Sequence, residues 1–147
     1  MTRPLVKRID MALHIQELCA VNNIQVKYQS LHDETPRYVA NPSTRCITIR
    51  PTKNTGYYVS ALHEIGHIIG DRQAVHLPTL EKEVWAWVYA RQNALVWTET
   101  AERIMQRAMD SYGWTQREKQ IWTEQSVTVE QKRLSICNYG WTQREIA

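Results

Sequence analysis

The sequence lacks paired cysteines, long apolar runs and basic clusters, and each absence narrows the class of protein. Its three cysteines, Cys19, Cys46 and Cys137, are scattered and form no Cys-x-x-Cys pair. This argues against a disulfide framework or a thiolate zinc site and predicts reduced thiols in a cytoplasmic protein. No apolar run approaches the roughly 18 residues that a membrane-spanning helix needs. The charged N-terminus has no unbroken apolar stretch behind it, so a signal peptide is not expected.

The charges are balanced along the chain, with a formal net charge of +3 in 147 residues. After residue 100, seven Lys and Arg residues are matched by six acidic residues, and no basic run is present. Direct nucleic-acid binding, including a DNA-associated regulator built on the C-terminal half, is therefore not expected. The hydrophobic content of 43% is that of an ordinary globular protein. The length predicts one domain over residues 1–147, and nothing in the sequence indicates its oligomeric state.

Hydrophobic periodicity predicts an α+β fold with a mixed first half and a helical second half. The expected elements are, in order, a helix over about 5–19 ended by Asn22-Asn23, strands near 24–28, 37–40 and 45–50, a helix from about 57, and a helix from about 80. The last two strands are joined by a turn at Asn41-Pro42. A break is expected from Gly70 to Pro78. Residues from about 112 to 147 are expected to form a helical extension of the same domain.

The stretch SALHEIGHIIGDRQ, residues 60–73, contains His63, Glu64 and His67 in the pattern His-Glu-x-x-His. Residues four apart share one face of a helix, so both imidazoles can reach one zinc ion at about 2.0–2.1 Å. Glu64 lies one step round the helix, where it can act as general base toward a water at the metal without being a ligand. Burying these polar side chains costs free energy unless they are paired with other groups or bound to a metal. The pattern is expected by chance only about 0.01 times in such a chain, so it predicts a zincin active-site helix.

The third metal ligand is open between several residues. Gln73 stands where a metzincin would have a third histidine, but an amide is a poor zinc ligand, and His76 comes three residues later. The gluzincin arrangement instead takes a carboxylate from the next helix, which begins with Glu81 and Glu83. Glu83 shares a helical face with small residues that allow close helix packing. Glu81 points elsewhere and is expected to face solvent or cap the helix. We therefore expect Glu83 to be the third ligand.

The segments VSALHEIGHIIG (59–70) and EKEVWAWVYARQNAL (81–95) together resemble the ImmA/IrrE-type metallopeptidases of phages and mobile elements. The resemblance covers about residues 5–97 and implies a zincin-like fold. It also implies Zn²⁺ held by His63, His67 and Glu83, with Glu64 as the catalytic residue. The implied substrate is a protein partner, typically a transcriptional repressor or an antitoxin-like regulator cut at one site.

The predicted function is zinc-dependent hydrolysis of a specific protein, which also requires a donor for the developing oxyanion. Tyr57, Tyr58 and His76 are the candidates near the motif. The strand RCITIR (45–50) is either an edge to which a substrate peptide adds or an ordinary sheet strand. The alternative function is a metal-binding zincin-fold protein with little turnover that meets a partner through its Trp-rich helices. Core packing is the plainer role for these tryptophans.

The segment YGWTQRE occurs twice, at 112–118 and at 139–145. Each copy predicts a helix junction in which glycine ends one helix and a capping box begins the next. The boxes pair Thr115 with Glu118 and Thr142 with Glu145. We interpret the copies as one helix-capping motif that occurs twice, because two copies are too few for a solenoid repeat.

Overall fold

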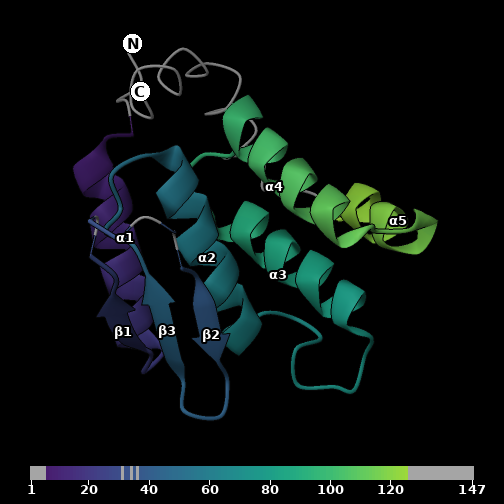
Figure 1. Cartoon of the computed structure of the whole chain (residues 1–147), viewed down its shortest axis with the longest axis horizontal. Coiled ribbons are helices and arrows are strands. Elements are labelled where there is room, and N and C mark those ends of the chain that lie inside the picture. The colour runs from purple at the N-terminus through teal and green to yellow at the C-terminus, as the bar shows by residue number, and fades with distance from the viewer. Residues whose placement is uncertain (1–5, 31, 34, 36, 126–147) are drawn as a thin grey trace.

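The computed structural model describes residues 6–30, 32–33, 35 and 37–125, which form five helices and a small mixed sheet (Figure 1). The elements are α1 (Arg8–Val21), β1 (Gln25–Tyr28), β2 (Val39–Asn41), β3 (Cys46–Ile49), α2 (Thr55–Ile69), α3 (Thr79–Asn93), α4 (Glu99–Tyr112) and α5 (Gln116–Glu124). Figure 1 shows the sheet against α1 and α2, with α3, α4 and α5 beyond α2. The α+β class is confirmed. Cys137 and the second YGWTQRE copy lie outside the described residues.

Helix α1 covers the sheet through one face and ends where the sequence predicts. Its buried residues are Met11, Ile15 and Cys19, each four residues from the next. The chain leaves the helix through Asn23, whose φ of 56° is left-handed, a conformation that Asn adopts more readily than most residues. The apolar spacing through Ile9 and Leu13 does not mark the buried face, because these side chains are 59% and 53% exposed. The face through Met11 is the one that meets the core.

The sheet has the order β1-β3-β2, with β1 parallel and β2 antiparallel to β3. Ile47 and Ile49 of β3 alternate with less buried neighbours and are fully buried themselves. The turn from β2 to β3 is held by Asn41, whose side-chain oxygen accepts from two backbone N–H groups at 3.1 and 3.3 Å. The RCITIR strand is therefore the central strand, and the prediction that it offers a free edge is wrong. The edge strand of the sheet that contacts α2 is β2.

Helices α2 and α3 form the most extensive helix contact among the described residues. Asn54 caps α2 by accepting a hydrogen bond from the backbone of Tyr57 at 2.9 Å. Further along α2, the backbone of Gly66 lies directly against Ala86 of α3. The small residues predicted on this face of α3 allow the two helices to pack closely. The helix that carries His63 and His67 therefore lies directly against the helix that carries Glu83.

The first copy of YGWTQRE forms the predicted junction between α4 and α5. Gly113 ends α4 with a left-handed φ of 76°, a conformation that favours glycine. Thr115 and Glu118 form the capping box, with the Glu118 carboxylate accepting from the Thr115 backbone at 2.7 Å. Arg91 of α3 donates to the Trp122 carbonyl of α5 at 2.7 Å and lies 3.5 Å over its ring. The described part of the C-terminal extension thus packs on the same core.

Most tryptophans of the described residues are core residues. The buried ones, between 3% and 9% exposed, are Trp87, Trp97, Trp114 and Trp122. Trp85 is partly exposed. The Trp-rich helices therefore use their rings for packing, as the plainer reading predicted. The alternative function, in which these helices meet a partner, stays a prediction.

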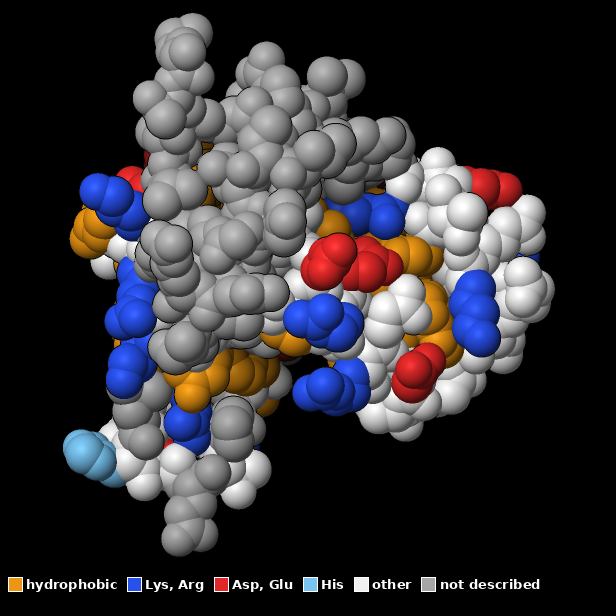
Figure 2. Space-filling model, turned by 90° about the horizontal axis from the view of Figure 1, so that it is seen from above, with side chains coloured by type: hydrophobic (Ala, Val, Ile, Leu, Met, Phe, Trp, Pro, Cys, Tyr) orange, Lys and Arg blue, Asp and Glu red, His pale blue; other side chains and the backbone are white. Residues whose placement is uncertain are grey.

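The surface carries charges of both signs. In Figure 2, acidic and basic side chains lie beside one another on the visible face of the molecule. Among the residues that the structure describes, no helix is both long enough and apolar enough to cross a membrane.

Candidate metal centre

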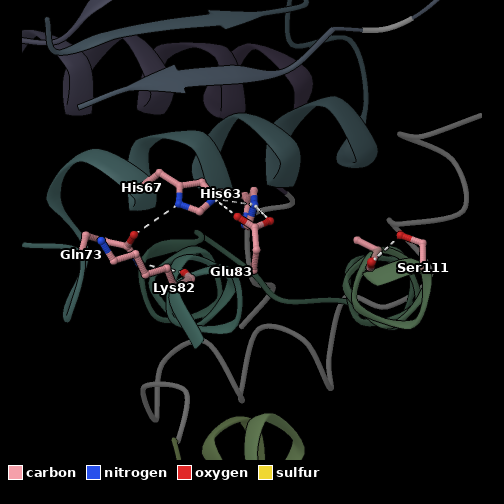
Figure 3. Close-up of polar contacts among 7 residues, drawn as sticks. His63, His67, Gln73, Lys82, Glu83 and Ser111 are labelled. Carbon is pink, nitrogen blue, oxygen red and sulfur yellow. Dashed lines mark hydrogen bonds and ion pairs between the residues drawn. The ribbon is translucent and has the colours of Figure 1, made fainter. Parts of the chain in front are cut away.

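Two helices bring three metal-ligating side chains to one point. His63 and His67 lie about one turn apart on α2, and Glu83 lies near the N-terminal end of α3. Figure 3 shows the three side chains pointing toward one another from these helices. Their ligand atoms all lie within 4.8 Å of one another, so the group can hold a metal ion.

The distances within this group suit a tetrahedral site. The Nε2 atom of His63 lies 3.2 Å from Nε2 of His67 and 3.3 Å from Oε1 of Glu83. Ligand atoms bonded at about 2.0–2.1 Å to a tetrahedral zinc ion lie about 3.3–3.4 Å apart. The His67 Nε2 and Glu83 Oε2 atoms are 2.5 Å apart, a hydrogen-bond distance that is shorter than the spacing of two zinc ligands. Two imidazole nitrogens and one carboxylate oxygen therefore fit a metal ion.

Burial and mutual contacts set the protonation of the three side chains. Burial lowers the pKa of His63 despite the opposing hydrogen bond to Glu83, so this imidazole is neutral, as ligation requires. Burial also acts to lower the pKa of His67 and to raise that of Glu83. The hydrogen bonds and charges of the group outweigh it, so the pKa of His67 is raised and that of Glu83 is held well below its usual range. A metal cation bound to this group would take the place of the proton on His67.

Two neighbouring side chains hold the imidazoles in place. The Gln73 side-chain oxygen lies 3.3 Å from Nδ1 of His67, and its amide donates to the Lys82 carbonyl at 2.8 Å (Figure 3). This contact directs the other nitrogen of His67 into the ligand group. Trp87 stacks on His63 with ring centroids 4.2 Å apart. Sequence reasoning weighed Gln73 only as a ligand, because no local pattern shows that the loop folds back onto α3.

Glu64 shares a cavity with the ligand group without belonging to it. The cavity has a volume of about 530 Å³, and Glu64 on its wall is only 8% exposed. Burial raises the pKa of Glu64 to about 7, with His67 opposing and Glu83 adding to the shift. A carboxyl group with a pKa near neutrality can both accept and return a proton at neutral pH. This is the property that a general base needs.

Four elements form the walls of this cavity. The lining includes Tyr38, Val39, Ala40 and Pro42 at β2, Ser60 on α2, Thr79, Lys82 and Trp87 on α3, and Ala108 and Tyr112 on α4. Two of these, Tyr38 and Tyr112, were not expected from the sequence. They reach the cavity through tertiary packing and lie far from the His-Glu-x-x-His motif along the chain, so no local signal marks them.

The candidates for an oxyanion donor near the motif do not face this cavity. His76 is exposed and Tyr57 is half-buried, and neither lines the cavity. Tyr58 is only 1% exposed, and its hydroxyl lies 2.6 Å from Nδ1 of His14 and accepts from the Leu95 backbone at 3.0 Å. The hydroxyl of Tyr58 is thus engaged in the core, and the suggestion that it stabilises an oxyanion is wrong.

Glu81 also differs from the sequence-based expectation. It does not face solvent: it is 6% exposed and forms an ion pair with Arg117 of α5. The reason is that α5 packs against α3 and covers its first turn. Glu81 does point away from the ligand group, as predicted, and it does not belong to that group.

A scan against models of known protein families and searches of curated proteins and of solved structures found no match for this chain. The assignment of a function therefore depends on the geometry around His63, Glu64, His67 and Glu83.

Proposed function

We propose that this protein is a zinc-dependent endopeptidase with a zincin-like fold of the gluzincin type. His63, His67 and Glu83 are its zinc ligands and Glu64 is its general base. The observation that carries the proposal is the convergence of two imidazoles and a carboxylate at tetrahedral spacing, beside a second, buried carboxyl group in the same cavity. Three protein donors of this kind with one position left for water or substrate are typical of catalytic zinc.

The residues of the site have distinct parts in peptide hydrolysis. A bound zinc ion would be held by His63, His67 and Glu83 and would supply Lewis acidity. Glu64 accepts a proton from the attacking water while the water oxygen forms a bond to the scissile carbonyl carbon, and the C=O electron pair moves to the carbonyl oxygen. When that pair returns, the C–N bond breaks and Glu64 passes its proton to the leaving amine. Water and a peptide bond thus become a carboxylic acid and an amine.

The edge strand β2 provides a binding place for an extended substrate. Val39 and Ala40 line the cavity, and β2 pairs on one side with β3 while its other side has no strand partner among the described residues. A peptide can add to such an edge through backbone hydrogen bonds. The resemblance to the ImmA/IrrE-type peptidases supports a protein substrate, such as a transcriptional repressor.

The full-length chain can test this proposal directly. Protein purified in the presence of Zn²⁺ is expected to hold about one zinc ion per chain by elemental analysis. It is expected to cut a proteome-derived peptide library at a narrow set of sites, read by mass spectrometry. Glu64→Gln is expected to keep zinc and fold but to slow cleavage by about 10²–10⁴-fold, because the general base is lost.

Glu17→Gln is the matched control, since Glu17 is exposed on α1, away from the cavity. This variant is expected to bind zinc and cut at the wild-type rate. A wild-type chain that binds no zinc contradicts the proposal, as does a Glu64→Gln variant that cuts as fast as wild type.

A further inference from the structure

We propose that Tyr112 is the oxyanion donor of this site: its phenolic O–H donates a hydrogen bond to the scissile carbonyl oxygen as that oxygen gains charge. The inference rests on the proposed peptidase function and adds a residue to it. Hydrolysis of an amide places negative charge on the carbonyl oxygen, and a preorganised donor there stabilises the transition state. Glu64 takes up the proton of the attacking water in this step and later passes it to the leaving amine, so the donor to the carbonyl oxygen must be another residue of the cavity.

Tyr112 is placed for this role by the end of α4. It is the last residue of that helix and lines the cavity that contains Glu64 and Glu83. Its side chain is 54% exposed, so the phenol has room to meet a substrate. In Figure 3, the turn of α4 that holds Ser111, the preceding residue, lies across from Glu83. A peptide on the edge of β2 would thus pass between the sheet and the end of α4.

The phenol of Tyr112 shares the cavity with Glu64 and Glu83 and keeps its proton at neutral pH. The ordinary pKa of a phenol is about 10. A neutral phenol at neutral pH is a donor. No proton leaves Tyr112 in this step: the hydrogen bond forms to the carbonyl oxygen as it gains the electron pair, and it weakens when the C–N bond breaks.

Two other donor residues of the cavity, Tyr38 and Lys82, are less well placed. The hydroxyl oxygen of Tyr38 is buried by protein atoms and has no hydrogen-bond partner, so it is not open to a substrate. Burial raises the pKa of Tyr38, and Arg50 acts against this shift. The backbone of Lys82 accepts from Gln73, which places this residue on the His67 side of the ligand group. Tyr112 is the more accessible of the two phenols that line the cavity.

The first YGWTQRE copy explains why Tyr112 stays in this position. Gly113 adopts a left-handed φ of 76°, so α4 stops immediately after Tyr112. Arg117 then forms an ion pair with the buried Glu81, which ties α5 to the first turn of α3. Glu83 lies two residues beyond Glu81 on that helix. The junction therefore joins the end of α4 to the helix that carries the proposed third ligand.

Tyr112→Phe removes the hydroxyl alone and is the direct test. On a peptide that wild type cuts, kcat is expected to fall about 10²–10³-fold with little change in KM. Zinc content and Tm are expected to stay at wild-type values. A phosphinic pseudo-peptide with the cleaved sequence mimics the charged tetrahedral oxygen. Its affinity is expected to fall by a similar factor in Tyr112→Phe, a change that a merely structural role would not produce.

Tyr57→Phe is the matched control, because Tyr57 does not line the cavity, and it is expected to keep wild-type kcat and phosphinate affinity. Wild-type values in Tyr112→Phe would overturn the inference, while loss of cleavage in Glu64→Gln would still support the proposed function. The inference is equally overturned if Tyr38→Phe or Lys82→Met causes the loss instead, or if Tyr112→Phe raises KM alone. A zinc-loaded wild type that cuts nothing removes both proposals together.

Discussion

Gly66 of α2 lies so close to Ala86 of α3 that a Cβ atom added at Gly66 would stand 2.7 Å from the Ala86 carbonyl oxygen. His63 and His67 flank Gly66 on α2, and Glu83 precedes Ala86 on α3. The separation between the two histidines and the carboxylate is therefore set at this backbone contact. The candidate metal centre therefore depends on a residue that has no side chain.

Gly66→Ala is expected to push α2 and α3 apart, because the atom it meets belongs to the backbone and cannot move alone. Both Tm and zinc affinity should fall, the affinity by about 10-fold or more. Thermal unfolding and competition against a chromophoric chelator measure the two effects. Gly56→Ala is the control within α2, since its Cβ would meet the side-chain atoms of Asn54 and Ile104 at 3.3 and 3.4 Å. A Gly66→Ala chain with wild-type zinc affinity would show that this contact does not set the site.

Glu83→Ala is expected to weaken zinc binding by more than about 100-fold, because it removes a charged ligand and not merely a group that supports one. His76→Ala is expected to leave the affinity near wild type, since His76 is exposed and outside the ligand group.

Glu81→Gln should lower Tm by breaking the ion pair with Arg117 and leave zinc affinity largely intact. If His76→Ala empties the site while Glu83→Ala leaves it full, the ligand set is metzincin-like. The resemblance to ImmA/IrrE-type peptidases then loses its main support.

Gln73→Ala is expected to reduce zinc affinity by about 10–100-fold, less than Glu83→Ala does. The reason is that Gln73 orients His67 through Nδ1 and is itself held by the Lys82 carbonyl. Isothermal titration with Zn²⁺ in a competing buffer gives the affinities. Gln16→Ala, an exposed position on α1, is the control and should match wild type. An unchanged affinity in Gln73→Ala would mean that the imidazole needs no such support.

The local part of the site could be predicted from the sequence because helical geometry is local. The spacing of His63 and His67 puts both rings on one face of one helix. The same geometry separates Glu81 from Glu83 on the next helix, and the structure indeed brings only Glu83 to the histidines. The order of helices and strands follows equally from short-range periodicity and from turn residues such as Asn41.

The remaining features depend on which distant segments meet, and short-range patterns do not encode that. Glu81 is buried because Arg117, 36 residues later, reaches back to it. The strand at 46–49 is central because β1 and β2 pair on both of its sides. Ile9 and Leu13 fit a helical stripe as well as the buried residues do, yet they face outward. Tyr112 reaches the cavity only because the end of α4 lies beside α3.

Glu64 provides a test of the site that needs no substrate. Burial raises its pKa from 4.5 to about 7, so the native state binds this proton more tightly than the unfolded chain does. Ionising Glu64 therefore requires more free energy in the native state than in the unfolded chain. In metal-free protein, the wild-type free energy of unfolding is expected to fall relative to that of Glu64→Gln as the pH rises from about 4.5 to about 7. Above that range the difference should stay constant, about 3 kcal/mol below its value at low pH.

Urea unfolding of both proteins in the presence of a chelator, at pH steps from about 4 to about 8, measures this difference. Groups distant from Glu64 cancel in the comparison, whereas the coupling of His67 and Glu83 to Glu64 is part of the measured difference. Glu99→Gln, at an exposed position on α4, should track wild type across the whole range. A wild-type chain that gains stability over Glu64→Gln as the pH rises would reverse the expected sign. It would mean that Glu64 is stabilised as a carboxylate in the metal-free protein, and the assignment of this residue as a general base poised near neutrality would then fail.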